Sequence, residues 1–166
     1  MRTPIFIAVL LLAVLGGCSL FRPASTANAP AAAGAAAPKV SLADEQRRLA
    51  DLFRGTPVVF AMQDDGSLMV TVPLHFSFDR GRYAVKPALG AVLDRIAKSQ
   101  RAEATRLRVA APADPRSKRL ALATERATSA RDYLVGRGID AARFSVSALG
   151  SGDRVILFIV ADAPAQ

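Results

Sequence analysis

The sequence predicts one α/β domain, in which a small mixed sheet carries two principal helices on one face and is preceded by an N-terminal helix and a hairpin. Three observations predict this fold class. Residues 107–146 read as a strand, a loop, a helix, a turn and a second strand. Residues 68–78 alternate between apolar and polar side chains, the period of a strand with one buried face, and residues 86–99 and 120–134 carry apolar side chains at helical spacing. A chain of 166 residues has room for one such domain and not for two of ordinary size.

Residues 1–17 are predicted to be a lipoprotein signal peptide. Arg2 precedes an apolar run at residues 5–15, which is too short to span a bilayer but suits the hydrophobic part of a secretory signal. The run ends in Leu15-Gly16-Gly17-Cys18, which resembles the lipobox of bacterial lipoprotein precursors, where the signal is cut before a cysteine that is then acylated. The alternative is a chance cysteine after an ordinary secretory signal. Because Cys18 is the only cysteine, no intramolecular disulfide and no thiolate metal cluster can form.

Residues 18–40 are predicted to be the lipidated cysteine and a flexible tether rich in alanine and proline. No later segment reaches the ~18 apolar residues of a spanning helix, so membrane attachment is expected through the lipid alone. Ser19 resembles the residue that follows the cysteine in lipoproteins sorted to the outer membrane, which is the predicted location, facing the periplasm.

The charge of the chain is strongly positive, with 22 basic and 14 acidic side chains and a formal net charge of +8. Such an excess suits DNA, anionic lipid or an anionic polymer. The predicted export argues against DNA, so no nucleic-acid partner is expected. The charge alone does not choose between lipid and polymer.

The domain is predicted to open with a helix and the first hairpin strand, within residues 41–67. Ser41 suits a helix N-cap, and residues 58–62 read as the strand. An Asp-Gly pair follows, which hairpin turns favour. The return strand over residues 68–78 contains Pro73, which cannot donate to the ladder and therefore predicts an edge, a bulge or a non-bonding position there.

The remainder of the domain, to residue 162, is predicted to alternate helices and strands. Pro87 suits the first position of the helix at residues 86–99. The helix at residues 120–134 is followed by Gly136, which suits a helix end, and has the length of a crossover. The strands on either side of it are therefore expected to be parallel, either as neighbours or separated by one strand. Residues 154–160 read as the last strand.

Several of these residues resemble the carboxy-terminal OmpA-like domain, a family that includes the peptidoglycan-associated lipoproteins and the MotB-type stator domains. The resemblance covers residues 68–160 and implies a β-α-β-α-β-β order with the helices on one face. The residues that carry it are Phe76-Ser77-Phe78-Asp79 before a helix, Asp114 after the next strand, Arg126-Ala127 in the second helix, Asp132-Tyr133-Leu134-Val135, and Gly138-Ile139-Asp140-Ala141-Ala142-Arg143-Phe144. A lipidated N-terminus with a tether is also similar to the layout of the peptidoglycan-associated lipoproteins.

The resemblance implies non-covalent binding of the peptidoglycan stem peptide at its diaminopimelate residue. That end group presents an ammonium and a carboxylate together, so its binding site needs an acid and a base at a fixed separation. On this resemblance Asp114 and Arg126 are the expected ligand residues, and Arg119 and Arg154 are further candidates. The expected partners are peptidoglycan, the membrane through the lipid anchor, and possible envelope-complex proteins, with no cofactor and no metal.

The motif also departs from the family pattern, which leaves alternatives open. Ala111-Pro112-Ala113 replaces the usual glycine, histidine and threonine before the aspartate, and Arg119 stands where the family usually has an asparagine. Asp114 can instead serve a turn, since Asp-Pro is a common turn opener. Arg126, expected between the apolar stripe and the solvent side of its helix, can instead form an ion pair with the neighbours of Glu125 or with Asp114.

The leading functional prediction is a non-enzymatic outer-membrane lipoprotein that binds peptidoglycan and links the membrane to the cell wall. The alternative is a structural or assembly lipoprotein of an envelope secretion or pilus system, which uses the domain for protein–protein interaction. An enzyme is not expected, because His75 is the only histidine and no cysteine or suitably spaced acid completes a catalytic set. His75 is predicted to be solvated.

Overall fold

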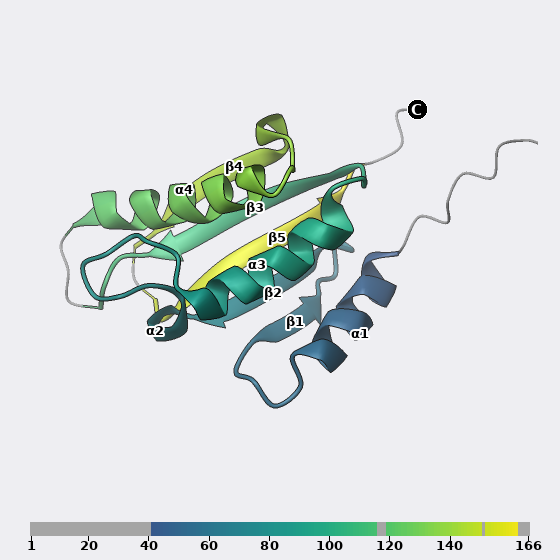
Figure 1. Cartoon of the computed structure of the whole chain (residues 1–166), viewed down its shortest axis with the longest axis horizontal. Coiled ribbons are helices and arrows are strands. Elements are labelled where there is room, and N and C mark those ends of the chain that lie inside the picture. Colours follow the sequence, from purple (N-terminus) through teal and green to yellow (C-terminus); the bar gives the residue numbers. More distant parts are fainter. Residues whose placement is uncertain (1–40, 116–118, 151, 163–166) are drawn as a thin grey trace, which may run out of the picture. The chain divides into compact units, whose positions relative to one another are not determined.

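The computed structural model describes residues 41–115, 119–150 and 152–162 (Figure 1). The predicted signal peptide, the lipidation site Cys18 and the predicted tether lie outside the described residues. Within the part of the chain that is described, no helix is both long and apolar enough to cross a membrane.

A five-stranded mixed sheet forms the centre of the domain, as the fold class predicted. Its strands lie in the order β1-β2-β5-β3-β4. Strands β3 and β4 are parallel neighbours, which is one of the two arrangements that the crossover length left open, and the other adjacent pairs are antiparallel. The strands are β1 (Val59–Met62), β2 (Leu68–Pro73), β3 (Thr105–Pro112), β4 (Phe144–Leu149) and β5 (Arg154–Ala161).

The helices α3 and α4 lie across the same face of this sheet (Figure 1). Helix α3 buries Leu89, Val92, Leu93 and Ile96 in the core, against inward-facing side chains of β2, β3 and β5. Helix α4 approaches the sheet through alanines, and Ala127 and Ala130 are fully buried. The helices are α1 (Leu42–Leu52), α2 (Leu74–Ser77), α3 (Pro87–Gln100) and α4 (Leu120–Gly136), and a 3₁₀ turn, η1, spans Ala141–Arg143.

The N-terminal helix α1 packs beside β1 and joins the same core. Ser41 accepts a hydrogen bond from the backbone N–H of Asp44 at 3.1 Å, so it is the N-cap that the sequence predicted. Leu49 is fully buried. Since β1 pairs with β2, residues on both sides of the predicted boundary at position 67 contribute to one sheet.

The predicted strand over residues 68–78 is too long: β2 ends at Pro73, and one helical turn, α2, follows. The turn closes through the backbone N–H of Phe78, which donates to the carbonyl of Leu74 at 2.9 Å, and through Ser77 Oγ, which donates to the Pro73 carbonyl at 2.9 Å. Pro73 cannot continue the ladder as a donor, so the chain turns away from the sheet there. The apolar alternation continues across the break, but within the turn Leu74 and Phe78 are buried while Phe76 is exposed.

Candidate functional site

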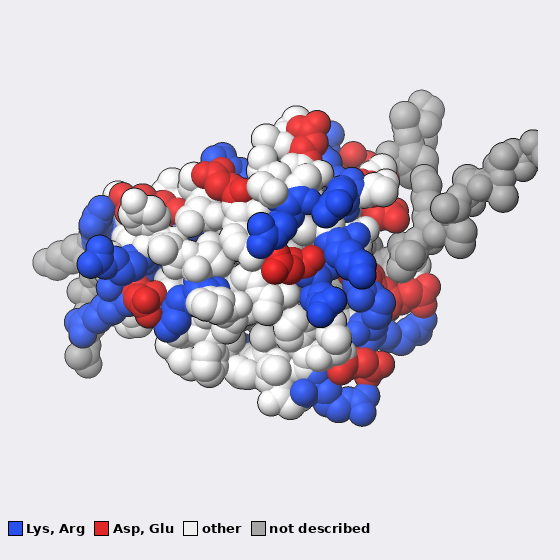
Figure 2. Space-filling model, in the orientation of Figure 1, with Lys and Arg blue, Asp and Glu red and all other residues white. Residues whose placement is uncertain are grey.

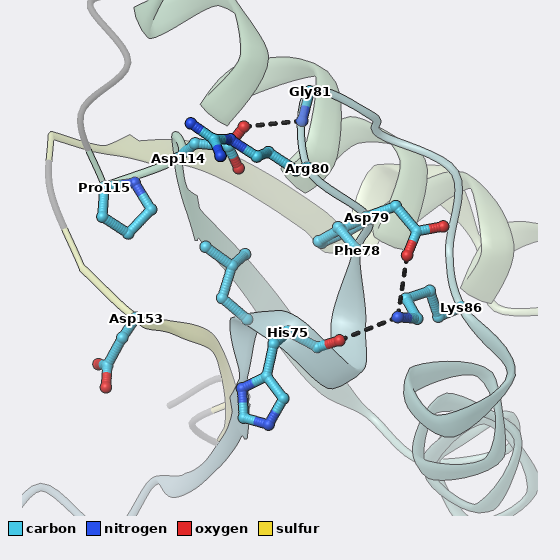
Figure 3. Close-up of a pocket in the computed structure, with 10 residues that line it drawn as sticks. His75, Phe78, Asp79, Arg80, Gly81, Lys86, Asp114, Pro115 and Asp153 are labelled. Carbon is cyan, nitrogen blue, oxygen red and sulfur yellow. Dashed lines mark hydrogen bonds and ion pairs between the residues drawn. The ribbon is translucent and has the colours of Figure 1, made fainter.

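A pocket of about 900 Å³ lies at one end of the three inner strands of the sheet, where β2 and β3 end and β5 begins. Its walls come from three segments that are distant in sequence (Figure 3). The segment between β2 and α3 contributes residues 74–75, 78–81 and 86, the end of β3 contributes residues 114–115, and the approach to β5 contributes Asp153. The lining therefore combines apolar side chains with acids and bases.

Asp114 stands in the wall of this pocket, and the partners of its carboxylate fix its position. Oδ1 accepts a hydrogen bond from Arg126 Nη2 at 2.6 Å, and Oδ2 accepts one from the backbone N–H of Gly81 at 2.7 Å. Partial burial opposes ionisation, but these hydrogen bonds, with the charges of Arg126 and Arg80, hold the pKa of the Asp114 carboxyl below its ordinary value. The pocket thus presents a permanent carboxylate at neutral pH.

Arg126 lies beneath Asp114, with its side chain completely buried. Besides the bond to Asp114, its guanidinium donates to the carbonyls of Arg82 at 2.9 Å, Pro112 at 3.0 Å and Asp79 at 3.1 Å. It also lies 5.4 Å from the ring centre of Phe78. All three guanidinium nitrogens therefore have protein partners, and the side chain ties the loop before α3 to the end of β3.

The prediction that Arg126 lies between the apolar stripe and the solvent side of its helix is wrong, because its side chain is fully buried against the loop before α3 and the end of β3. The alternative prediction of an ion pair between Arg126 and Asp114 is confirmed. The two residues predicted to act together are thus brought together. Only Asp114 of this pair belongs to the pocket lining.

The other two sequence candidates, Arg119 and Arg154, do not belong to the described lining of the pocket. Arg119 pairs with Glu125 at 3.0 Å, and Arg154 Nε lies 3.9 Å from the carboxylate of Asp153. A part for either in ligand binding stays a prediction. His75 is exposed on the pocket rim, in α2 and not in a strand.

Two further bases line the pocket that the sequence did not single out. Lys86 Nζ pairs with Asp79 Oδ1 at 2.9 Å and donates to the His75 carbonyl at 3.0 Å. Arg80 is exposed beside Asp114 (Figure 3), and no carboxylate of the described residues lies within ion-pairing distance of it. The only sequence signal for both was their place in a short charged loop next to Asp79. No group of acids, histidines or cysteines among the described residues could hold a metal ion.

At several places on the described surface, Lys and Arg side chains (blue) outnumber Asp and Glu (red), including the region around the loop before α3 (Figure 2). This loop contributes Arg80, Arg82 and Lys86 against the single acid Asp79. The pocket therefore opens in a locally basic part of the domain, although its own wall holds three carboxylates, those of Asp79, Asp114 and Asp153.

Solved structures share this fold. The cell wall anchor of the T6SS from Pseudomonas aeruginosa matches with a TM-score of 0.62 and 22% identity, covering 75% of this chain and 99% of that one. The periplasmic domain of Helicobacter pylori MotB matches with a TM-score of 0.55 and 21% identity, covering 66% and 83%. A MotB-like protein from Desulfovibrio vulgaris matches with a TM-score of 0.59 and 17% identity, covering 72% and 91%. At such identities the likeness shows the fold.

No curated protein matches the chain. A sequence model of the OmpA family matches residues 77–156, which include the loop before α3, Asp114 and Arg126. The family predicted from the sequence is confirmed: residues 77–156 of this chain form a domain of the OmpA family.

Proposed function

We propose that this protein binds peptidoglycan without cleaving it, and so anchors a component of the bacterial envelope to the cell wall. The observation that carries the proposal is the ionised Asp114 carboxylate, held in the wall of an open pocket within an OmpA-family domain. The structural neighbours include a cell wall anchor and a periplasmic domain, which fits such a role. The pocket lining offers no nucleophile and base in a catalytic arrangement among the described residues.

The group that we propose as ligand is the diaminopimelate end of the stem peptide. Its ammonium suits Asp114, whose oxygens each retain an accepting position beyond the bonds to Arg126 and Gly81. Arg126 is buried and bonded at each nitrogen, so we infer that it acts indirectly, by orienting Asp114. Arg119 and Arg154 are proposed only as long-range attraction for an anionic polymer.

We also propose that acylation of Cys18 holds the protein on the outer membrane, and that residues 19–40 let the domain reach the wall. The support is the lipobox-like Leu15-Gly16-Gly17-Cys18 together with the alanine- and proline-rich segment after it. Growth with a labelled fatty acid should label the wild-type chain and leave Cys18→Ser unlabelled. Equal labelling of the two would show that the anchor is elsewhere.

Retention on purified peptidoglycan sacculi tests the binding proposal. The full-length chain, extracted in detergent, should sediment with sacculi, whereas Asp114→Asn should stay largely in the supernatant. Asparagine removes the charge and keeps one oxygen, which can accept from Arg126 or from Gly81 but not from both. Far-UV circular dichroism of the variant therefore accompanies the assay, to separate loss of retention from loss of the fold. The matched control is Asp132→Asn on α4. Among the residues that the structure describes, this carboxylate pairs with the neighbouring Arg131 alone, so the variant should leave retention unchanged.

The second candidate function is assembly of an envelope machine through protein–protein contacts. It is favoured by the sheet face opposite the helices, where Ile156, Phe158 and Val160 of β5 are only half-buried. Failure of sacculi to retain the wild-type chain, with specific co-purification of an envelope protein that substitution at Phe158 abolishes, would support this candidate over the anchor.

A further inference from the structure

The zwitterionic end group proposed as ligand carries a carboxylate as well as an ammonium, and the structure leaves the carboxylate without an obvious partner. Arg126 is 0% exposed, and each of its nitrogens already donates to a carbonyl or to Asp114. Because the side chain has no exposed surface, a ligand carboxylate could reach it only if the loop that supplies the Asp79 and Arg82 carbonyls moved and broke these bonds. A second cation at the pocket surface would supply the strongest replacement for this contact.

Two long basic side chains line the pocket, and they differ in their present partners. Lys86 is committed to Asp79 and to the carbonyl of His75. Arg80 has no carboxylate within ion-pairing distance among the described residues, and its side chain is exposed. Arginine also presents two parallel N–H donors that match the two oxygens of a carboxylate, a geometry that lysine lacks. Arg80 is thus the better suited of the two.

The backbone holds Arg80 next to Asp114. The N–H of the adjoining residue, Gly81, donates to Asp114 Oδ2 at 2.7 Å. Gly81 has a φ of 68°, a conformation that glycine adopts readily, and this turn lets the N–H face the carboxylate. On the other side of Arg80, the carbonyl of Asp79 accepts from Arg126 Nη2 at 3.1 Å. The loop therefore keeps an acid and a base side by side at one wall of the pocket (Figure 3).

We propose that Arg80 binds the carboxylate of the end group whose ammonium is bound by Asp114. This inference rests on the proposed function, since it names the residue that distinguishes a zwitterionic end from a plain amine. The contact lies on the loop before α3 and replaces a direct part for Arg126 in recognition. The ligand class is an amino-acid end group with a free ammonium and a free carboxylate on one carbon.

Calorimetric titration of the full-length chain with two small probes tests the inference. Diaminopimelate carries both charged groups at each end, and cadaverine carries the two ammonium groups alone. The wild type should bind diaminopimelate at least about 10-fold more tightly than cadaverine, the gain expected of a charge-assisted bidentate contact. Arg80→Ala should bind the two probes with nearly equal affinity, and Arg80→Lys should recover only part of the preference.

The matched control is Arg82→Ala, in the same loop. Arg82 is exposed, does not line the pocket, and contributes to the fold through its carbonyl, which the substitution keeps. It should retain the wild-type preference. An unchanged preference in Arg80→Ala, or a wild type that binds neither probe, would overturn the inference, while retention on sacculi decides the proposed function separately. Far-UV circular dichroism of each variant excludes loss of the fold as the cause.

Discussion

Removing the guanidinium of Arg126 should destabilise the domain more than any other single loss of charge in the described structure. Arg126→Ala deletes four hydrogen bonds at once and leaves three carbonyls and the Asp114 carboxylate without this donor. Breaking a buried charged pair by removing one partner costs about 3–5 kcal/mol. Domains of this kind are stable by only about 5–15 kcal/mol, so the expected loss is a large fraction of the total.

A lysine at this position should restore only part of the loss. Its single ammonium cannot reach carbonyls from Arg82, Pro112 and Asp79 together, because these surround a planar fork. We therefore expect Arg126→Lys to lower the free energy of unfolding by about 2 kcal/mol, the scale of one or two charged hydrogen bonds. Urea denaturation of the full-length chain, followed by circular dichroism, measures these losses as shifts in the midpoint at constant slope.

The control for this series is Arg131→Ala on the same helix. Arg131 pairs with its neighbour Asp132 at the surface, and its loss should change the free energy of unfolding by no more than about 0.5 kcal/mol. If Arg126→Ala proved no more destabilising than Arg131→Ala, the role of Arg126 as a tie between loops would be refuted.

Two further predictions concern pH and packing. Because the folded-state pKa of Asp114 is lowered, its contribution to stability is fully present above the unfolded-state pKa of about 3.9 and is lost as the pH falls through the folded-state pKa. Acid unfolding curves of Asp114→Asn should lack this loss of stability. An identical dependence on acid in the wild type and the variant would contradict the lowered pKa of Asp114. In α3, a Cβ added at Gly90 would lie 3.0 Å from the hydroxyl of Tyr133. Gly90→Ala should therefore gain less than the helix propensity of about 1 kcal/mol in the wild type and recover that gain in a Tyr133→Phe background, as thermal unfolding of the double-mutant cycle would show.

Local patterns in the sequence were sufficient to predict most of the fold. The parallel pairing of β3 and β4 followed from the length of the helix between them, and the N-cap at Ser41 followed from residue type. The end of β2 was missed because Leu74, Phe76 and Phe78 continue an apolar alternation through a helical turn. Alternation reports which residues are apolar, and here Pro73 decided where the strand stopped.

The candidate site was predicted less completely than the fold. The proximity of Asp114 and Arg126 followed from the resemblance, whereas the burial of Arg126 depends on carbonyls 44 and 47 residues away in sequence. Backbone acceptors leave no trace in residue identity, so no pattern could reveal them. Arg80 was overlooked for a related reason, since only the bond from Gly81 to Asp114 places that loop at the pocket.

The buried guanidinium of Arg126 has a consequence for the affinity of the pocket for a ligand. A binding loop that is flexible without ligand must become ordered on binding, and the free-energy cost of this ordering lowers the affinity. Here the Arg126 guanidinium already joins the loop before α3 to the end of β3 in the absence of ligand. The ligand proposed above would therefore meet a preorganised site, and little of its binding free energy would be lost in ordering the loop.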